Sequence, residues 1–202
     1  MAKLVHGVGI NDADYNIIEH KFIDGKWRAI WRCPFYLKWS GVIQRCYSEK
    51  WHKNHPKYSD CSAVPEWHYF MTFRAWMEKQ DWEGKELDKD LLIPGNRVYG
   101  PDTCVFLDKK TNLFLRRIEI TKEGKLTGVG WDERNRKFKS HSCDILSGKQ
   151  KFLGFSDSRV EAHQKWLDFK MEQALILAEQ QKDFRISNAI VEYFKNFSKE
   201  LK

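Results

Sequence analysis

Residues 87–112, LDKDLLIPGNRVYGPDTCVFLDKKTN, decide the fold of the first half of this chain. Two aspartates flank a lysine at the start of the segment, and turn-forming sequences follow at residues 94–96 and 100–102. A short apolar run at residues 104–107 comes next, and Asn112 closes the segment. This order predicts a strand, an ordered loop, a second strand and the start of a helix, which together make a ββα unit.

The composition is that of a folded and basic protein. Hydrophobic residues make up 42% of the 202 residues and aromatic residues 14%, which is more than a disordered chain contains. The length allows two small domains, each with its own core. The 35 Lys and Arg residues exceed the 28 Asp and Glu residues, giving a formal charge of +7. This balance favours a polyanionic partner, although a soluble protein can also be basic without one.

Cysteine usage and hydropathy indicate the compartment. The five cysteines are an odd number without close spacing, which is typical of free thiols in a reducing environment. The first residues show no signal-peptide pattern, and no apolar run is long enough to span a bilayer. We therefore expect a cytoplasmic protein without a membrane partner.

Hydrophobic spacing predicts a hairpin and two helices before residue 87. A turn at residues 24–25 joins two short strands within an otherwise irregular lead-in. Apolar residues then recur at helical spacing over residues 34–47, and a second amphipathic helix is expected over residues 68–80. Their aromatic side chains are expected to form a core.

The second half of the chain changes to short strands. Strands predicted over residues 127–132, 137–145 and 151–155 make an antiparallel meander. Ser158, with Glu161 three residues later, is a capping-box sequence that starts a long helix. The expected fold class is α+β, with a ββα unit packed with helices and then a three-stranded antiparallel sheet with a helix.

Basic residues concentrate in this predicted meander. Residues 134–151 contain six basic side chains and one acid, Asp144. Because side chains alternate across a strand, Lys137 and Lys139 share a face with His141. Such a face can hold phosphates and reach guanine edges, whereas the alternative is a solvated edge whose charges oppose aggregation. The expected DNA-binding residues are Arg134, Arg136, Lys137, Lys139, Lys149 and Lys151.

Residues 127–173 also contain a series of short motifs in a fixed order. The series consists of Gly128-Val129 with Trp131, the basic turn at residues 134–137, Lys151-Phe152-Leu153-Gly154-Phe155 and Glu161-Ala162. In this order and spacing it resembles an Apetala-type DNA-binding domain, in which a three-stranded sheet packs on one helix. The resemblance implies double-stranded DNA as the partner.

A second series of motifs lies upstream. It includes Arg45-Cys46-Tyr47-Ser48, Tyr58-Ser59-Asp60-Cys61, Leu87-Asp88-Lys89-Asp90, Gly95-Asn96 and Pro101-Asp102-Thr103-Cys104. This series resembles a bacteriophage family of HNH endonuclease-like proteins, whose members commonly carry a C-terminal Apetala-type domain. Together the two resemblances cover most of residues 33–173 and imply a phage-encoded protein that binds DNA in the host cytoplasm.

The expected organisation has four parts. They are an irregular lead-in at residues 1–32, an HNH-nuclease-like domain at 33–120, an Apetala-type DNA-binding domain at 125–182 and an amphipathic helix at 183–202. A turn at residues 122–125 separates the two domains. The last helix either docks on the preceding domain or offers a surface to a partner.

The resemblance implies metal-assisted hydrolysis of a phosphodiester, but the catalytic base departs from the family pattern. The first strand of an active HNH site supplies a histidine that deprotonates water, and here Lys89 stands between Asp88 and Asp90 instead. A lysine takes a proton at neutral pH only if burial strongly lowers its pKa. His68 or His52 could supply the base from outside the motif. The expected catalytic set is Asp88, Lys89, Asp90 and His68.

Oxygen ligands in the same segment suggest a divalent metal. Asp88 and Asp90 share a face if they lie on a strand, and with Asn112 they could gather Mg²⁺ or another divalent ion. Asp88 has a structural alternative, because such acids often cap turns. The spacing of His52 and His55 also suggests zinc, but no closely spaced cysteine pair accompanies them, so zinc is disfavoured.

Three functions from different classes follow. The first is an endonuclease-like protein that binds DNA and nicks or cleaves it with a divalent metal. The second is a catalytically inactive binder that recognises DNA or occupies a host protein, and Lys89 favours it. The third is RNA binding by the aromatic first half, which predicts a preference for single strands. The oligomeric state is left open.

Overall fold

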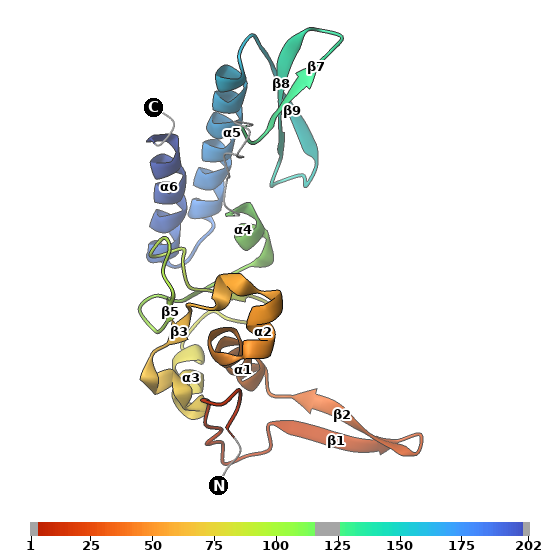
Figure 1. Ribbon diagram of the computed structural model, residues 1–202, viewed down its shortest axis with the longest axis vertical. Coiled ribbons are helices and arrows are strands. Elements are labelled where there is room, and N and C mark those ends of the chain that lie inside the picture. Colours follow the sequence, from red (N-terminus) through yellow and green to blue (C-terminus); the bar gives the residue numbers. More distant parts are fainter. Residues whose placement is uncertain (1–3, 116–125, 200–202) are drawn as a thin grey trace. The chain divides into compact units, whose positions relative to one another are not determined.

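The computed structural model describes residues 4–115 and 126–199, and the chain divides into two compact units, Met1–Leu107 and Asp108–Lys202 (Figure 1). The fold is mixed α+β, as the sequence predicted. The turn expected at residues 122–125 lies outside the described residues. None of the described helices combines the length and the apolarity that a bilayer span requires.

The first unit contains the predicted hairpin. Strands β1 (Ile18–Ile23) and β2 (Lys26–Arg32) pair antiparallel, which confirms the turn expected at residues 24–25. The φ angles are 50° at Asp24 and 75° at Gly25, and two successive positive values are what a type I′ turn requires. The two strands, of 6 and 7 residues, are longer than the short strands that the sequence indicated.

The core of the first unit lies between two helices, α1 (Pro34–Tyr47) and α3 (Phe70–Met77). The helix predicted over residues 34–47 is confirmed, and Pro34 occupies its first turn, where an N–H would have no helical partner. The second helix is shorter than predicted because a 3₁₀ turn, η2 (Pro65–His68), precedes it. The buried side chains of these elements are Trp39, Val42, Ile43, Cys46, Trp67, Phe70, Phe73 and Met77.

Short elements complete this unit. Helix α2 (Glu49–Asn54) and the 3₁₀ turn η1 (Pro56–Tyr58) follow α1. Strand β3 (Ser62–Ala63) pairs parallel with β5 (Val98–Tyr99), and β4 (Glu86–Asp88) pairs antiparallel with β6 (Val105–Leu107). Residues 87–107 therefore form the predicted strand, loop and strand.

Helix α4 (Lys109–Phe114) follows β6, so the predicted order of elements is present. Asp108 caps this helix by accepting a hydrogen bond from the Thr111 N–H at 2.8 Å. However, α4 belongs to the second unit, whereas both strands belong to the first. The structure thus confirms the succession of strands and helix but not an HNH-like unit.

The second unit is built on a three-stranded antiparallel sheet. Strands β7 (Val129–Asp132), β8 (Lys137–Cys143) and β9 (Gln150–Ser156) lie in the order β7-β8-β9, which confirms the predicted meander. Helix α5 (Arg159–Glu179) packs along one face of this sheet. The Ser158 hydroxyl accepts a hydrogen bond from the Glu161 N–H at 3.2 Å, as a capping residue does.

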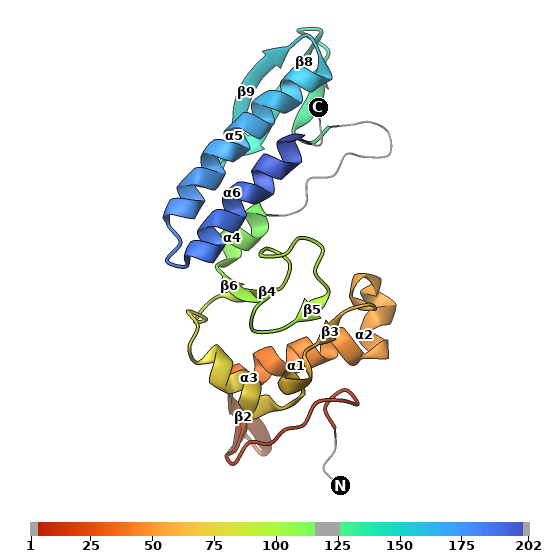
Figure 2. The same cartoon turned by 90° about the vertical axis from the view of Figure 1, so that its left-hand side faces the viewer.

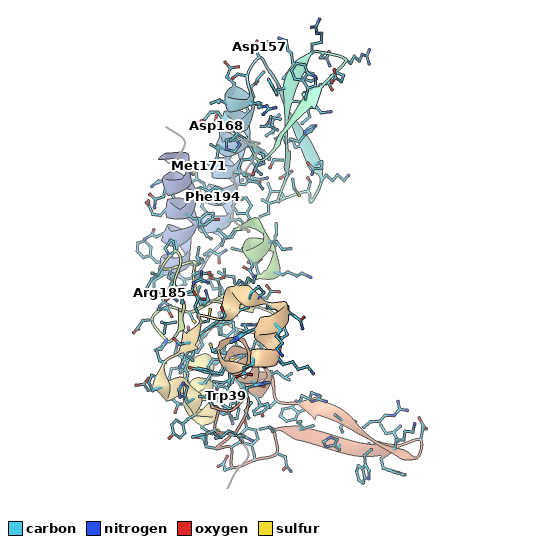
Figure 3. The ribbon with its side chains drawn as sticks, in the orientation of Figure 1. Trp39, Asp157, Asp168, Met171, Arg185 and Phe194 are labelled. Atoms are coloured by element: carbon cyan, nitrogen blue, oxygen red, sulfur yellow. The ribbon has the colours of Figure 1, made fainter. Side chains whose placement is uncertain are left out.

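The C-terminal helix belongs to this second unit. Helix α6 (Phe184–Lys199) runs beside α5, and Ile186, Ile190 and Phe194 on one side of it are buried (Figure 2). The ring of Phe194 lies 5.0 Å from that of Phe114 on α4 (Phe194 is labelled in Figure 3). The amphipathic C-terminal segment therefore docks on the fold, which was one of its two expected alternatives.

Candidate nucleic-acid interface

Asp88 at the end of β4 caps a tight turn. Its carboxylate accepts hydrogen bonds from the backbone N–H groups of Asp90 at 3.1 Å and Leu91 at 2.8 Å. Burial raises the pKa of Asp88, and the nearby negative charge of Asp90 raises it further, while the two N–H donors act in the opposite direction. Asp88 thus caps a turn in this fold, which was its structural alternative to a metal ligand.

Lys89 fixes the loop that follows. Its side chain is buried, with 6% of the residue exposed, and its ammonium donates to the Asn96 carbonyl at 2.7 Å and to the Asp90 carboxylate at 3.1 Å. The Asn96 amide in turn donates to the carbonyls of Lys89 and Val98, both at 2.7 Å. Because an ammonium offers donors and no acceptor, Lys89 is unsuited in this arrangement to take a proton from water.

The two histidines considered as alternative bases hold neighbouring elements together. The Nε2 atom of His68 lies 2.9 Å from the Tyr47 hydroxyl, which also accepts a hydrogen bond from the Ala63 N–H at 3.0 Å. The Nε2 atom of His52 donates to the Arg45 carbonyl at 2.7 Å. His68 thus links η2 to α1 and β3, and His52 links α2 to α1.

The predicted metal ligands are divided between the two units. Asp88 and Asp90 lie in the first, and Asn112 lies on α4 in the second, where its backbone N–H donates to the Asp108 carbonyl at 3.0 Å. A cation between the two aspartates would meet the positive charge of Lys89, so these side chains fit a divalent metal poorly. In residues 4–115 and 126–199, no group of three or more His, Cys, Asp or Glu side chains could hold a metal ion. The magnesium site stays a prediction.

The sheet of the second unit has one face against α5 and an opposite face that we call the open face. Ser140 and Ser142 of β8 are buried toward the helix. Because side chains alternate along the strand, the intervening residues Lys139 and His141 lie on the open face, as does Cys143 at the end of β8. Cys143 is exposed, whereas the other four cysteines are buried.

Strand β9 adds two aromatic residues to the open face. Phe152 pairs with His141 and Phe155 pairs with Lys139, and the two phenyl rings are 4.9 Å apart. Strict alternation would place residues 152 and 155 on opposite faces. The register shift at Leu153 brings them to the same face, so they remain 52% and 37% exposed. The sequence pattern did not mark Phe152 and Phe155 as site residues, although Gly154 within the strand pattern was a signal for a bulge.

Ion pairs reduce the charge surplus that the sequence count suggested. Lys139 lies 3.5 Å from Asp132, and Lys137 lies 3.1 Å from the highly exposed Asp157, which precedes α5 (Figure 3). The pKa of Asp132 is lowered, first by the backbone N–H of Asn135 in the turn between β7 and β8. Both acids flank residues 134–151 in sequence, so the count of six basic residues against one acid left them out.

The other predicted DNA-binding residues occupy two different environments. Arg134 and Arg136 are exposed in the β7–β8 turn, and Lys149 is exposed in the β8–β9 loop. Within the described part of the chain, none of these three side chains forms an ion pair. Lys151 differs, because it pairs with Ser142 and its ammonium lies 4.5 Å from the centre of the Phe169 ring on α5. Lys151 therefore points to the helix side of the sheet.

No family model, curated protein or solved structure matches this chain. The similarities to HNH endonuclease-like proteins and to Apetala-type domains thus remain expectations from the sequence motifs alone.

Proposed function

We propose that this protein binds double-stranded DNA through the open face of the β7–β8–β9 sheet and the basic residues of the turns at its two ends. The observation that carries the proposal is that basic side chains and exposed aromatic rings share this face. β-structure can enter the major groove, where arginine reaches guanine edges and lysine contacts phosphates. Phe152 and Phe155 would supply apolar contacts to thymine methyl groups.

The charge distribution supports a phosphate-rich partner. Arg134, Arg136 and Lys149 have no ion pair within the described residues, so they can contact phosphates without losing an internal partner. Lys137 and Lys139 form partly exposed ion pairs, which contribute little to stability and can be exchanged for phosphate contacts.

Contacts with α5 hold the basic loop in place before binding. Asp144 accepts hydrogen bonds from the Ser147 hydroxyl at 2.8 Å and from the Gln173 amide of α5 at 3.1 Å. These bonds connect the loop that carries Lys149 to the helix. A loop that is ordered in the free protein loses less conformational entropy on binding, which favours affinity.

The proposal is binding without hydrolysis. Asp88 caps a turn and Lys89 donates to a backbone carbonyl, so the segment expected to be catalytic already has a structural use. Lys89, which stands in place of the catalytic histidine, is thus engaged in hydrogen bonds within the loop. His68 and His52, the two alternative bases, also form hydrogen bonds that hold neighbouring elements together.

A binding assay on the full chain tests this function. Fluorescence anisotropy with a labelled DNA duplex would compare the parent with Arg134→Gln/Arg136→Gln and with the control Lys50→Gln/Lys53→Gln, two exposed lysines on α2. Loss of an arginine that reaches a base edge weakens binding by about 1–3 kcal/mol. We expect the Kd of the sheet variant to rise by at least about tenfold and that of the control to change little. Equal effects of the two variants, or no binding by the parent, would reject the proposal.

A further inference from the structure

The β1–β2 hairpin is an isolated ribbon in the first unit. Every residue of β2 is exposed, and so are the four central residues of β1. In Figure 1 the two strands extend away from α1 and α3, and in Figure 3 their side chains point outward on both sides. A two-stranded hairpin with both faces in water is at best marginally stable on its own, so its extension needs a reason other than core formation.

The two faces of this ribbon differ in chemistry. Lys21 is directly opposite Arg28, and Lys26 lies on the same side, opposite Ile23. We call this side, with Lys21, Lys26 and Arg28, the basic face. The other side carries Phe22 and Trp27, which are directly opposite each other with ring centres 5.6 Å apart. Near the turn, side-chain alternation therefore separates the basic residues from the aromatic pair. At the other end of the ribbon the two kinds of residue mix, because Trp31 is opposite Glu19 on the side of Lys21 and Arg32 is opposite Ile18 on the side of Phe22.

The positive charges of the basic face are only partly compensated within the ribbon. Like charges directly opposite each other destabilise an antiparallel pair, and Lys21 and Arg28 are such a pair. Two acids lie on the ribbon. Asp24 is 4.0 Å from Arg28, and both side chains are more than half exposed. Glu19 lies two residues before Lys21 on the same side of β1, and it is exposed. Within residues 4–115 and 126–199, no ion pair involves Lys21 or Lys26. An external anion would remove this repulsion.

We propose that the β1–β2 hairpin is a second DNA-contacting element, whose basic face binds the duplex. This inference rests on the proposed function, because it takes duplex DNA as the ligand of the protein. Residues 18–32 contain four basic and two acidic residues, which makes the ribbon complementary to phosphates and opposes its pairing with a second copy. Lys21 and Arg28 lie side by side, so together they can contact phosphates or base edges within one groove.

The dimensions of the ribbon favour duplex DNA over RNA. The major groove of B-DNA admits a two-stranded β-ribbon, whereas the major groove of an RNA duplex is too narrow for protein elements. The rings of Phe22 and Trp27 meet edge to face at 64°, so they do not form one continuous platform on which successive single-stranded bases could stack. This pair lies next to the turn, where it stabilises the hairpin as a cross-strand contact.

One assay compares the contributions of the hairpin and of the sheet to DNA binding. Anisotropy with a labelled DNA duplex would be measured between about 50 and 200 mM salt for the parent, Lys21→Gln/Arg28→Gln, Arg134→Gln/Arg136→Gln and the control Lys50→Gln/Lys53→Gln. All three variants lose two positive charges from exposed positions, and circular dichroism would verify that each is folded. Each phosphate contact contributes about −0.9 to the slope of log K against log salt, equivalent to about eightfold in affinity near 0.1 M salt.

We expect the hairpin variant to bind at least about tenfold more weakly than the control, with a slope shallower by about two. If the sheet variant loses affinity while the hairpin variant behaves like the control, the hairpin inference is overturned and the proposed function stands. If only the hairpin variant loses affinity, the inference stands and the sheet is not the DNA-binding surface. Absence of duplex binding by the parent, or a preference for a single-stranded competitor, would overturn the inference.

Discussion

Replacing Lys89 with methionine distinguishes a structural role of this lysine from a catalytic role. Methionine keeps much of the side-chain length but removes the ammonium, so the Asn96 carbonyl loses the donor that now lies at 2.7 Å. Leaving a partly buried acceptor without a partner costs about 1–3 kcal/mol. The lost contact with Asp90 adds little, because that carboxylate side chain is 51% exposed and can be hydrated.

The net loss in free energy of unfolding is therefore about 2 kcal/mol, since methionine also removes the cost of burying a charge. For a unit of this size such a loss lowers Tm by about 8 °C. Tryptophan fluorescence is a suitable probe, because seven of the nine tryptophans lie in residues 1–107. Lys79→Met, at an exposed position, is the matched control and should shift Tm by less than about 2 °C.

The same pair of variants tests the catalytic alternative. Duplex affinity should be equal in Lys89→Met and the parent, because the ammonium is directed into the loop. A parent that cleaves DNA with Mg²⁺ or Mn²⁺, together with a Lys89→Met variant of unchanged Tm that does not, would refute the structural role of this lysine.

Three further outcomes are expected. Asp88→Asn keeps an oxygen for the turn and removes a carboxyl whose pKa is raised in the folded state. Such a group stabilises the fold more as the pH falls through its folded pKa, so in urea unfolding the variant should be more stable than the parent at pH 7 and lose that advantage in acid. A Mg²⁺-dependent Tm that vanishes in the variant would indicate a metal ligand instead. Gly128→Ala should destabilise the second unit by at least about 2 kcal/mol in urea unfolding, because Gly128 has a φ of 79° and a Cβ there collides with the Trp166 ring. The control Gly148→Ala has a similar φ and open space around it, so it should cost about 1 kcal/mol. Equal losses in the two variants would contradict the contact with Trp166. Phe152→Ala should weaken duplex binding about threefold to tenfold without changing the salt slope, because it removes apolar contact and no charge. An unchanged affinity would place the ring outside the interface.

Elements with local signals were predicted well from the sequence. The helix at residues 34–47, the 24–25 turn and the three-stranded meander each depend on hydrophobic spacing or turn residues that lie close together in the chain. The C-terminal segment was recognised as amphipathic, but its docking on α5 depends on which surface the rest of the fold leaves apolar. That information is not local, and so the sequence left two alternatives open.

The candidate sites were less predictable for the same reason. Lys89 was identified by its position in a motif, but its function in the loop depends on Asn96, seven residues away. The placement of Phe152 and Phe155 depends on a one-residue shift in strand pairing, which reverses the face that alternation assigns. The net charge of residues 134–151 depends on Asp132 and Asp157, which lie just outside this range in sequence and form ion pairs with its lysines.

The distribution of the cysteines makes this protein simple to label at one place. Burial raises the pKa of the Cys46 thiol to about 12 and that of Cys104 to about 11, and Cys33 and Cys61 are also buried. Thiol reagents attack accessible thiolates, so under native conditions a maleimide fluorophore should react at Cys143. A dye at Cys143 would lie on the open face of the sheet, so its emission would report contact between this face and a ligand.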